Sequence, residues 1–560
     1  MRYPKEEIEN YRRNAGELEN DLIDEYRAGN LTRRELIQRG SVLGISLPFL
    51  GLLAGPAQGA TVRPTAATEP AQRRGGRIRI GTADINGSLE PPLLQSLANI
   101  SITQMSGEQL TYSDKNNILR PRLATKWTPS RGGRSWTFQI RRGVRFHDGK
   151  PMTVDDVVAT FKILLDPDSQ AQSSYKGVLR AVKKVGRDSV RFDLAGPYGL
   201  FPYLTAQMTY QSIILPKSYR LPTDLSKPGE FTSKMNGTGP FRLLANRGPG
   251  GLTWEANPNY WGGRPAIDRI EMQILDDQAR VTALQSGQID LAVQVSYEGA
   301  QQLERANKKV LPISSANHRY LNMNVTKEPF KDVRVRQAIA LALDRPGLAK
   351  GLWGKYGQVG NDSPMYPGYP YTAKVAQRKR NIAKARALLR AAGVENLKLE
   401  LTCYRQFEMP DYAQRVAQAL KQIGIDCSVK VFTSTQYFDG VSFGASGKLA
   451  PWLETDFGII DYGGRPVPIT YLNSGLKSGG VWNSARYANR AFDRILSNFY
   501  GAADLAGQRK YARQLQLKLL ADTPVIYAYF YNFIAATGQN VRGYVPGGMA
   551  DIDLRRVTVR

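Results

Sequence analysis

The sequence predicts an α/β protein whose mixed sheets are divided among more than one lobe. Segments with the two-residue alternation of half-buried strands are interspersed with segments that carry the apolar periodicity and end signals of helices. Around residues 397–432 a strand, a helix and a second strand follow one another with short links, which is typical of a parallel crossover unit. The length of 560 residues allows about three to four compact units.

The first half of the chain contains three predicted strands and one helix with a clear start. Residues 77–81 and 190–194 alternate as strands do, and residues 136–140 alternate tryptophan, phenylalanine and isoleucine with polar residues. Thr153 stands three residues before Asp156, a spacing that caps the first turn of a helix. A helix is therefore expected to begin directly after Thr153.

The second half of the chain is richer in helices, several of which end at a glycine. Residues 278–286 form a predicted helix that ends at Gly287, because glycine readily adopts the left-handed conformation of a helix end. The other predicted elements are a strand at 289–295, a helix at 382–392 ending at Gly393, a strand at 397–401, a helix at 412–423 ending at Gly424, a strand at 425–432, a helix at 505–520 and a strand at 524–531.

Composition excludes several classes of protein. Hydrophobic residues make up 42% of the chain and charged residues 22%, which is ordinary for a globular protein and excludes disorder throughout. No window holds about 20 unbroken apolar residues, so a polytopic membrane protein is excluded. The unusual quantity is the net charge of +27, from 76 basic and 49 acidic residues. Such a charge invites a nucleic acid, a membrane surface or an acidic ligand as partner.

The few cysteines and histidines limit redox and metal chemistry. Two cysteines can make neither a disulfide scaffold nor a four-cysteine zinc site. Cys403 and Cys427 lie at opposite ends of neighbouring predicted strands, about 10 Å or more apart, so we expect both to be reduced and packed. His147 and His318 are too few to capture a free metal ion, and neither a metal nor a cofactor is predicted.

The first sixty residues predict an export signal of the twin-arginine type. Arg33 and Arg34 precede a short apolar stretch at 41–55, and small residues follow at 56–60. The stretch is too short, and too interrupted by glycine and proline, to span a bilayer comfortably. The alternative interpretation is a buried helix beside a chance pair of arginines.

Export from the cytoplasm limits which partners the positive charge can attract. Cleavage is expected near Ala57 to Ala60, no cysteine follows it for a lipid anchor, and residues 61–75 have the composition of a flexible linker. A protein outside the cytoplasm rarely meets nucleic acid, and the basic residues are scattered. We therefore expect a solvated basic surface and no nucleic-acid partner, with weak attraction to an anionic membrane as the alternative.

Catalytic motifs are mostly absent from the sequence. There is no His-Glu-x-x-His, no Gly-x-Ser-x-Gly and no complete phosphate loop, although residues 444–448 resemble the tail of one. Residues 237–239 lack the third glycine of a dinucleotide fingerprint. A hydrolase that uses two distant carboxylates stays open. The 28 tyrosines and 7 tryptophans, many of them in loops rich in glycine and proline, favour a cleft that binds without turnover.

An ordered set of short motifs runs along the chain between about residues 75 and 555. They are Ala-Thr-Lys-Trp at 124–127, Trp-Thr-Phe-Gln-Ile-Arg-Arg-Gly-Val-Arg-Phe-His-Asp-Gly at 136–149, Asp-Asp-Val at 155–157, Asn-Gly-Thr-Gly-Pro-Phe at 236–241, Asn-Pro-Asn-Tyr-Trp at 257–261, Ala-Leu-Gln-Ser-Gly-Gln-Ile-Asp at 283–290, Asn-Met-Asn at 322–324, and Val-Arg-Val-Arg-Gln-Ala-Ile at 333–339 followed by Asp344-Arg345. Each motif alone is modest, and the ordered set is highly specific. In these motifs the chain resembles the extracellular solute-binding proteins of family 5, the peptide- and nickel-type receptors of ABC importers.

The resemblance implies a two-lobed periplasmic-binding-protein fold of type II, in the large peptide-binding subclass, with an extra subdomain inserted in the N-terminal lobe. A hinge is expected to close the two lobes on the ligand. The chain is expected to cross between the lobes near 314–320 and 522–529. The implied domains are the export signal at 1–60, the linker at 61–75, lobe 1 at 76–315 with the inserted subdomain at about 104–200, lobe 2 at 316–522, and a return to lobe 1 at 523–560.

Asp461 is the ligand anchor that the resemblance implies. Residues 457–468 occupy the place of a family segment whose aspartate holds the amino terminus of a peptide, and Asp461 matches that aspartate. A buried carboxylate that faces an ammonium is a sound physical anchor. Two departures bear on peptide specificity: Gly458 replaces the usual tryptophan, and Val467-Pro468 replaces Asp-Pro. The alternative role of Asp461 is that of a turn residue before two glycines.

Five further residues are candidates for ligand contacts. Arg405 follows a predicted strand and is a candidate partner for a ligand carboxylate, with an ordinary surface arginine as the alternative. The candidates for an aromatic wall of the cleft are Tyr112, Tyr404, Trp452 and Tyr462.

The function implied by the resemblance is that of a monomeric periplasmic receptor. It would capture a peptide or a peptide-like solute and deliver it to the permease and ATPase subunits of an ABC importer, without a catalytic step. The alternatives are an exported hydrolase of peptides or cell-wall fragments, a nutrient-sensing partner of a membrane receptor, and a receptor for opines, oligosaccharides or chelated metal. A ligand recovered intact would distinguish a receptor from a hydrolase.

Overall fold

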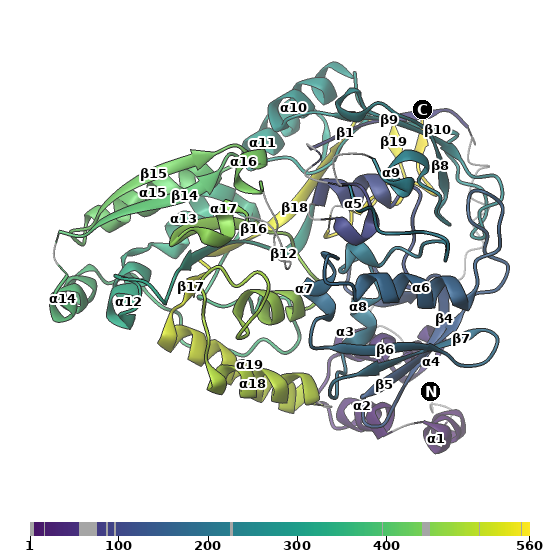
Figure 1. Ribbon diagram of the computed structural model, residues 1–560, viewed down its shortest axis with the longest axis horizontal. Coiled ribbons are helices and arrows are strands. Elements are labelled where there is room, and N and C mark those ends of the chain that lie inside the picture. Colours follow the sequence, from purple (N-terminus) through teal and green to yellow (C-terminus); the bar gives the residue numbers. More distant parts are fainter. Residues whose placement is uncertain are drawn as a thin grey trace.

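In the computed structural model, one large mixed sheet runs through both lobes of the molecule (Figure 1). The structure describes residues 5–15, 17–54, 75–83, 85, 88–94, 97–224, 228–394, 396–439, 449–502, 505–549 and 551–560. The strands of this sheet are β1 (Arg77–Thr82), β8 (Phe241–Asn246), β9 (Leu252–Ala256), β10 (Arg269–Ile274), β11 (Leu291–Ala292), β12 (Lys309–Met323), β13 (Gly357–Val359), β14 (Lys398–Tyr404), β15 (Asp426–Phe432), β16 (Phe457–Tyr462), β17 (Val525–Ile526) and β18 (Tyr529–Thr537). Their order is β15-β14-β16-β12-β18-β11-β1-β10-β9-β8, with β13 beside β18 and β17 beside β12.

Two neighbouring strands connect the halves of this sheet. We call the half that contains β1 and β8–β11 lobe 1, and the half that contains β14–β16 lobe 2. Residues 318–323 of β12 pair with β16 of lobe 2, whereas Ala536 and Thr537 of β18 pair with β11 of lobe 1. The strands β12 and β18 pair with each other in antiparallel orientation, and residues 314–316 of β12 lie opposite the single residue Asn532. Such an excess of residues on one strand bends and twists a strand pair.

Two helices, one before lobe 2 and one within it, end at the glycines that the sequence predicts. The helix α10 (Asp277–Ser286) ends at Gly287, which has a φ of +76°, and α14 (Ile382–Ala392) ends at Gly393, which has a φ of +70°. The strands β14 and β15 pair in parallel around α15 (Met409–Lys421), so the predicted crossover unit is confirmed. The other helices of these regions are α11 (Tyr297–Arg305), α12 (Val333–Ala342), α13 (Arg345–Trp353), α16 (Ser434–Tyr437), α17 (Pro451–Glu454), α18 (Arg490–Gly501) and α19 (Leu505–Asp522).

A second sheet, of four strands, lies between residues 124 and 194 with its own apolar core. Its strands are β4 (Ala124–Ser130), β5 (Ser135–Ile140), β6 (Leu179–Lys184) and β7 (Ser189–Leu194), in the order β4-β5-β7-β6. The helix α6 (Val154–Leu164) begins after Thr153, whose side chain forms the predicted capping box with Asp156. The aromatic rings of Phe161 and Phe192 meet edge to face at 4.7 Å. The smaller elements around both sheets are α5 (Leu97–Thr103), β2 (Thr111–Ser113), β3 (Leu119–Pro121), α7 (Gln172–Tyr175), α8 (Phe201–Leu204), α9 (Glu230–Lys234), β19 (Val541–Arg542) and β20 (Thr558–Val559).

Two predicted strands have different bounds in the structure. The strand expected at 289–295 shortens to β11, because Gln294 takes a positive φ of +57° that ends the extended backbone. The strand expected at 524–531 divides into β17 and β18, because the carbonyls of Tyr527 and Ala528 accept hydrogen bonds from backbone amides near residue 361 instead of forming a ladder. The second strand continues six residues beyond the predicted end, to Thr537.

Both cysteines are free, as expected. Cys403 is buried and Cys427 is half-buried, so only Cys403 is packed completely. In the parallel ladder Cys427 lies opposite Leu399, four residues before Cys403, which accounts for the missing disulfide.

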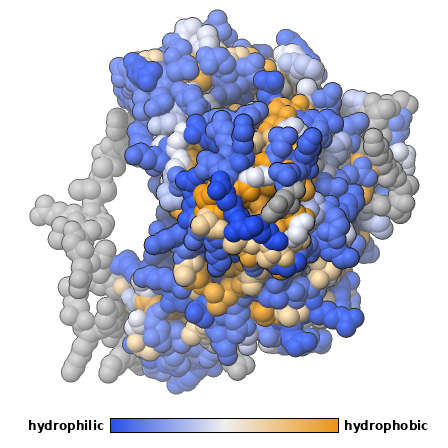
Figure 2. All heavy atoms as spheres, turned by 90° about the vertical axis from the view of Figure 1, so that its left-hand side faces the viewer, coloured by the Kyte–Doolittle hydropathy of each residue, from blue (hydrophilic) through white to orange (hydrophobic). Residues whose placement is uncertain are grey.

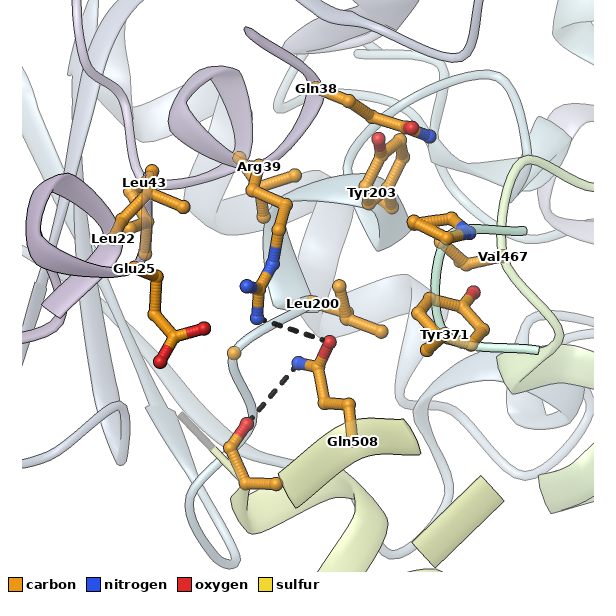
Figure 3. Close-up of a pocket in the computed structure, with 14 residues that line it drawn as sticks. Leu22, Glu25, Gln38, Arg39, Leu43, Leu200, Tyr203, Tyr371, Val467 and Gln508 are labelled. Carbon is orange, nitrogen blue, oxygen red and sulfur yellow. Dashed lines mark hydrogen bonds between the residues drawn. The ribbon is translucent and has the colours of Figure 1, made fainter. Parts of the chain in front are cut away.

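The N-terminal segment, residues 5–54, forms helices that contact both lobes. The helices are α1 (Lys5–Asn14), α2 (Glu17–Arg27), α3 (Arg33–Val42) and α4 (Leu47–Ala54). On the side of lobe 1, the indole of Trp127 donates a hydrogen bond of 2.7 Å to the carbonyl of Val42. On the side of lobe 2, Glu35 pairs with Arg509 at 2.8 Å, and Figure 3 shows Arg39 reaching Gln508.

Several predicted features lie outside the described residues, among them the cleavage region 57–60, residues 61–74 of the linker and the segment 444–448. Within the described chain, none of the helices is both long and apolar enough to cross a membrane. Figure 2 shows the face that carries the edge of lobe 2, where hydrophilic residues predominate around apolar residues gathered near the centre.

Candidate functional site

Asp461 lies at the end of β16, directly opposite Arg319 of β12 in the antiparallel ladder. Its Oδ1 atom accepts hydrogen bonds from the guanidinium of Arg319 and, at 2.5 Å, from the hydroxyl of Tyr531. Its Oδ2 atom makes no hydrogen bond with any residue that the structure describes, although only 7% of the side chain is exposed. One oxygen of the carboxylate is therefore held in place, and the other is available to a ligand.

Arg319 joins Asp461 to a second buried carboxylate. Its Nε and Nη2 atoms donate to the two oxygens of Glu408, each at 2.8 Å, and the hydroxyl of Tyr529 donates to Glu408 at 2.7 Å. The guanidinium also lies over the ring of Tyr531, 4.7 Å from its centroid. Burial raises the pKa of Asp461, and the charge of Arg319 opposes that shift. Two carboxylates thus share one guanidinium, an arrangement that favours the approach of a further cation.

Aromatic rings surround the neighbouring positions of the same two strands. The ring of Tyr462 is stacked on Trp482 at 5.8 Å, and His318, opposite Tyr462 in the ladder, meets the ring of Tyr471 at 4.6 Å. Burial lowers the pKa of His318 to about 3, so this imidazole is neutral at physiological pH. Side chains alternate along a strand, so these rings lie on the opposite face of β16 from Asp461.

The structure brings only some of the predicted ligand residues near Asp461. Burial is the main cause that raises the pKa of Tyr404, and the charge of Asp461 adds to it, which places the two side chains close together. Trp452 is buried beside Phe438, with ring centroids 6.3 Å apart. Arg405 is exposed, and it does not line any of the three pockets described below.

Tyr112 lies in lobe 1, away from these residues. Its hydroxyl donates to the carboxylate of Asp551 at 3.1 Å, and the guanidinium of Arg122 lies 5.1 Å from the centre of its ring. Tyr112 therefore lines a separate pocket, which includes Arg122 and Asp551, and does not belong to the surroundings of Asp461.

A small pocket with both polar and apolar lining groups lies where both lobes and the C-terminal return meet. Its wall includes the bent residues of β12 and a loop that follows Asp461. The lining residues are Ser113, Asp114, Lys115, Asn117, Gln207, Ser314, Ser315, Ala316, Tyr366, Gly464, Arg465, Pro466, Gly548, Met549 and Asp551. We call this space the seam pocket.

The sequence predictions missed Arg465 and Asp551, the two buried charged residues of the seam pocket. For Arg465 a signal was present, since an arginine between two glycines and a proline is held on a short, tight loop. For Asp551 the sequence held no signal, because Tyr112, which donates a hydrogen bond to it, lies 439 residues earlier.

A larger pocket lies between the N-terminal segment and the two lobes (Figure 3). Leu22 and Leu43 form one side of it, and Tyr371 and Val467 of lobe 2 form another. Because this space exists only with the N-terminal segment in place, the seam pocket is the better candidate for a permanent ligand site.

The ring of His147 lies between two backbone carbonyls. Both ring nitrogens of His147 lie within 3.1 Å of backbone carbonyl oxygens, those of Met235 and Gly239. No cluster of three or more histidine, cysteine or acidic side chains suited to a metal occurs in the part of the chain that the structure describes.

Comparison with known proteins gives the family. Residues 119–481 match the model of the bacterial extracellular solute-binding proteins, family 5. The chain belongs to this family. Its members are solute-binding proteins that work in the periplasm or outside the cell.

Two curated relatives from Bacillus subtilis (strain 168) align over nearly the whole chain. The oligopeptide-binding protein AppA is 27% identical over 91% of this chain and 96% of the relative. The dipeptide-binding protein DppE is 24% identical over 93% of this chain and 98% of the relative. The solved structure of AppA in complex with a nonapeptide superposes with a TM-score of 0.75 over 87% of this chain and all of that one, at 24% identity. This likeness confirms the two-lobed α/β fold.

Proposed function

We propose that this family 5 protein is the substrate-binding component of an ABC importer and that it captures peptides or peptide-like solutes between its lobes. The observation that carries the proposal is the carboxylate of Asp461, which is fixed by Arg319 and Tyr531 yet keeps Oδ2 for a ligand. An ammonium at that oxygen would balance the two carboxylates that share Arg319. The oligopeptide- and dipeptide-binding names of the two relatives support the same class of solute.

Release and capture require the lobes to move about β12 and β18. The proposed boundaries remain lobe 1 at 76–315, with its subdomain at about 104–200, lobe 2 at 316–522 and the return at 523–560. Contacts between lobe 1 and lobe 2 support closure as the bound state: the rings of Tyr198 and Tyr500 lie 4.5 Å apart, and the hydroxyl of Ser474 donates to the carbonyl of Ser173. Hinge bending would separate these pairs and open the cleft.

We further propose export through a twin-arginine signal. Arg33 and Arg34 occupy the exposed first turn of α3, directly after the capping residue Thr32, where an export receptor could reach them. Removal of residues 1–60 would leave the receptor in the periplasm, beside the permease and ATPase subunits that it would serve. No catalytic step is proposed.

The first experiment identifies the solute. The chain is purified from its native host without residues 1–60, and bound molecules are identified by native and denaturing mass spectrometry. We expect an intact peptide or peptide-like amine. Release of cleaved products from an added peptide would contradict the receptor role and favour an exported hydrolase, and a recovered sugar would overturn the class of solute.

A substitution tests the anchor. Asp461→Ala is expected to weaken the binding of peptides with a free amino terminus at least about tenfold, because the ammonium loses its charged partner. Calorimetric titration measures the affinity, and Asp411→Ala, on the exposed face of α15, is the matched control. An unchanged affinity in Asp461→Ala would remove the anchor role and leave a structural ion pair.

A further inference from the structure

The outer end of lobe 2 includes a segment of the chain whose only charges are positive. Residues 374–394 contain seven lysines and arginines and no aspartate or glutamate. The whole chain, by comparison, has 49 acidic residues beside its 76 basic ones. Seven of the 27 net positive charges therefore lie within one short segment, which contains the helix α14.

Five of these seven side chains are exposed on α14 or directly before it. Arg378 is different, because it is half-buried and pairs with Asp362 at 2.8 Å. The helix α14 buries Ala385 and Leu389 against the rest of lobe 2, so its basic side chains point outward. We call the five exposed residues the basic cluster: Lys379, Arg380, Lys384, Arg386 and Arg390.

No carboxylate of the described chain forms an ion pair with the basic cluster. Asp332, at the start of the neighbouring helix α12, is already paired with Arg334 at 2.5 Å. Arg380 and Arg386 donate instead to the side chain and the backbone carbonyl of Gln422, which are neutral groups. The charges of the cluster are therefore free to attract an anionic partner that approaches this end of the molecule.

The basic cluster covers a projecting end of the molecule rather than a cavity. The helices α12 and α14 lie together at the outer end of lobe 2 (Figure 1), and no member of the cluster lines any of the three pockets described above. Small ligands are usually held in concave sites, whereas an extended anionic surface attracts several separated charges at once. Val333, the first residue of α12, is 36% exposed at the same end, and an apolar side chain beside basic ones suits a lipid interface.

We propose that the basic cluster binds the surface of an anionic phospholipid membrane, so the receptor is held there by the outer end of lobe 2. The inference is independent of the solute and goes beyond the proposed function. Lipid is favoured over nucleic acid because members of the family work in the periplasm or outside the cell. Each lysine or arginine near an anionic lipid surface strengthens binding about fivefold, and the attraction acts only within about 10 Å. The helix α14 therefore faces the bilayer.

Attachment through one lobe leaves the hinge free to move. All five residues of the basic cluster belong to lobe 2, which is connected to lobe 1 through β12 and β18. Lobe 1 can therefore still rotate while α14 contacts lipid. A receptor confined to the membrane surface searches for a membrane partner in two dimensions instead of three, which shortens the search.

Vesicle flotation tests the proposal on the full chain. The protein is mixed with vesicles of phosphatidylcholine alone and with vesicles that also contain phosphatidylglycerol, whose headgroup is anionic. We expect flotation with the anionic vesicles only, and release as the salt concentration rises, because salt screens the attraction. Equal flotation with both kinds of vesicle, or with neither, would overturn the proposal. If duplex DNA added at equal charge displaces the vesicles completely, nucleic acid is the better partner and the proposal fails.

Substitutions assign the attraction to the basic cluster. The triple variant Lys379→Gln/Lys384→Gln/Arg390→Gln removes three exposed charges, and thermal unfolding checks that the fold is kept. We expect its partition onto anionic vesicles to fall about a hundredfold, which is three factors of about five. The variant Lys379→Arg/Lys384→Arg/Arg390→Lys keeps the charges and should bind as the wild type does. Loss of binding in this second variant would overturn attraction by charge.

A matched control separates the basic cluster from the net charge of the whole chain. Lys126, Arg180 and Arg187 are exposed in or beside the four-stranded sheet, at the opposite end of the molecule from α14. The variant Lys126→Gln/Arg180→Gln/Arg187→Gln lowers the net charge as much as the cluster variant does, yet it should weaken partition by less than about threefold. Equal losses in the two triple variants would show that diffuse charge attracts the membrane, and the proposal would fail.

Discussion

At the scale of single residues, burial determines what each charged side chain near the hinge can do. Asp461 was predicted from its motif, but its partner Arg319 was not, because a cross-strand pair separated by 142 residues leaves no local signal. Arg405 looked suitable in sequence and proved to be exposed, whereas Arg465, which was not predicted, is buried. The type of a residue can be read from a sequence, whereas the burial of its side chain away from water cannot.

The buried pair of Arg345 and Asp362 gives a stability prediction. Asp362 also pairs with Arg378 at 2.8 Å, so Asp362→Ala would leave two buried guanidinium groups without a counter-charge. We expect the free energy of unfolding to fall by about 3–5 kcal/mol. Urea denaturation followed by circular dichroism measures it. Asp411→Ala, which breaks an exposed pair with Arg415, should cost less than about 1 kcal/mol, and a similar loss in both variants would disprove the argument.

His318 gives a prediction about pH. Its folded pKa of about 3 lies below the ordinary value of 6.5, so between these values the unfolded chain binds a proton that the folded chain does not. Stability therefore rises with pH across that window, and acidification from pH 7 to pH 5 costs about 2 kcal/mol from this residue. His318→Asn can keep the hydrogen bond to the carbonyl of Ala316 and removes the titration. Between pH 7 and pH 5 the midpoint of urea denaturation should fall less in His318→Asn than in the wild type. Equal falls in the two proteins would contradict the prediction.

At the scale of elements, local signals were reliable where a few neighbouring residues decide the outcome. The capping pair Thr153–Asp156 and the glycine after α14 predicted helix ends correctly, because caps act within one turn. The bounds of β11 and β18 were not predictable, since each depends on which strand lies beside it. Strand limits are therefore a property of the sheet, whereas helix limits are largely a property of the helix.

The helix ends supply a prediction at this scale. Gly393 has a φ of +70°, and a Cβ atom added there would have no other atom within 4 Å. Backbone strain is therefore the only cost of Gly393→Ala, which should lower the free energy of unfolding by about 1 kcal/mol. Gly501 lies in the last turn of α18, also in open space, without a positive φ. Gly501→Ala should leave stability unchanged or raise it by up to about 1 kcal/mol. Thermal unfolding distinguishes the two, and equal shifts would refute the strain argument.

At the scale of the whole molecule, the N-terminal segment contacts both lobes. The fold and the family could be anticipated from ordered motifs spread along the chain, but a segment predicted as an export signal was not expected to touch lobe 1 at Trp127 and lobe 2 at Arg509. These contacts join residues 85 and 474 positions apart, and the sequence carries no spacing rule for either.

We infer that these contacts restrain opening, so ligand kinetics should differ between the full chain and a chain without residues 1–60. A chain that starts at residue 61 should bind peptide faster than the full chain, because α3 no longer holds the lobes together. An ion pair in which only the arginine is well exposed contributes about 1 kcal/mol, so Glu35→Gln in the full chain should raise the association rate by about fivefold. Stopped-flow measurements give these rates. Identical rates for the full and shortened chains would show that the N-terminal segment does not restrain opening.

The seam pocket borders residues 314–316, the part of β12 that bends opposite Asn532. A solute bound there would lie close to the axis about which the two lobes rotate. A displacement of a fraction of an ångström near the axis becomes a swing of several ångströms at the outer tips, where α14 and the four-stranded sheet lie at opposite ends of the molecule (Figure 1). A membrane partner that contacts the outer ends of both lobes could thus distinguish the solute-bound receptor from the empty one without contacting the solute.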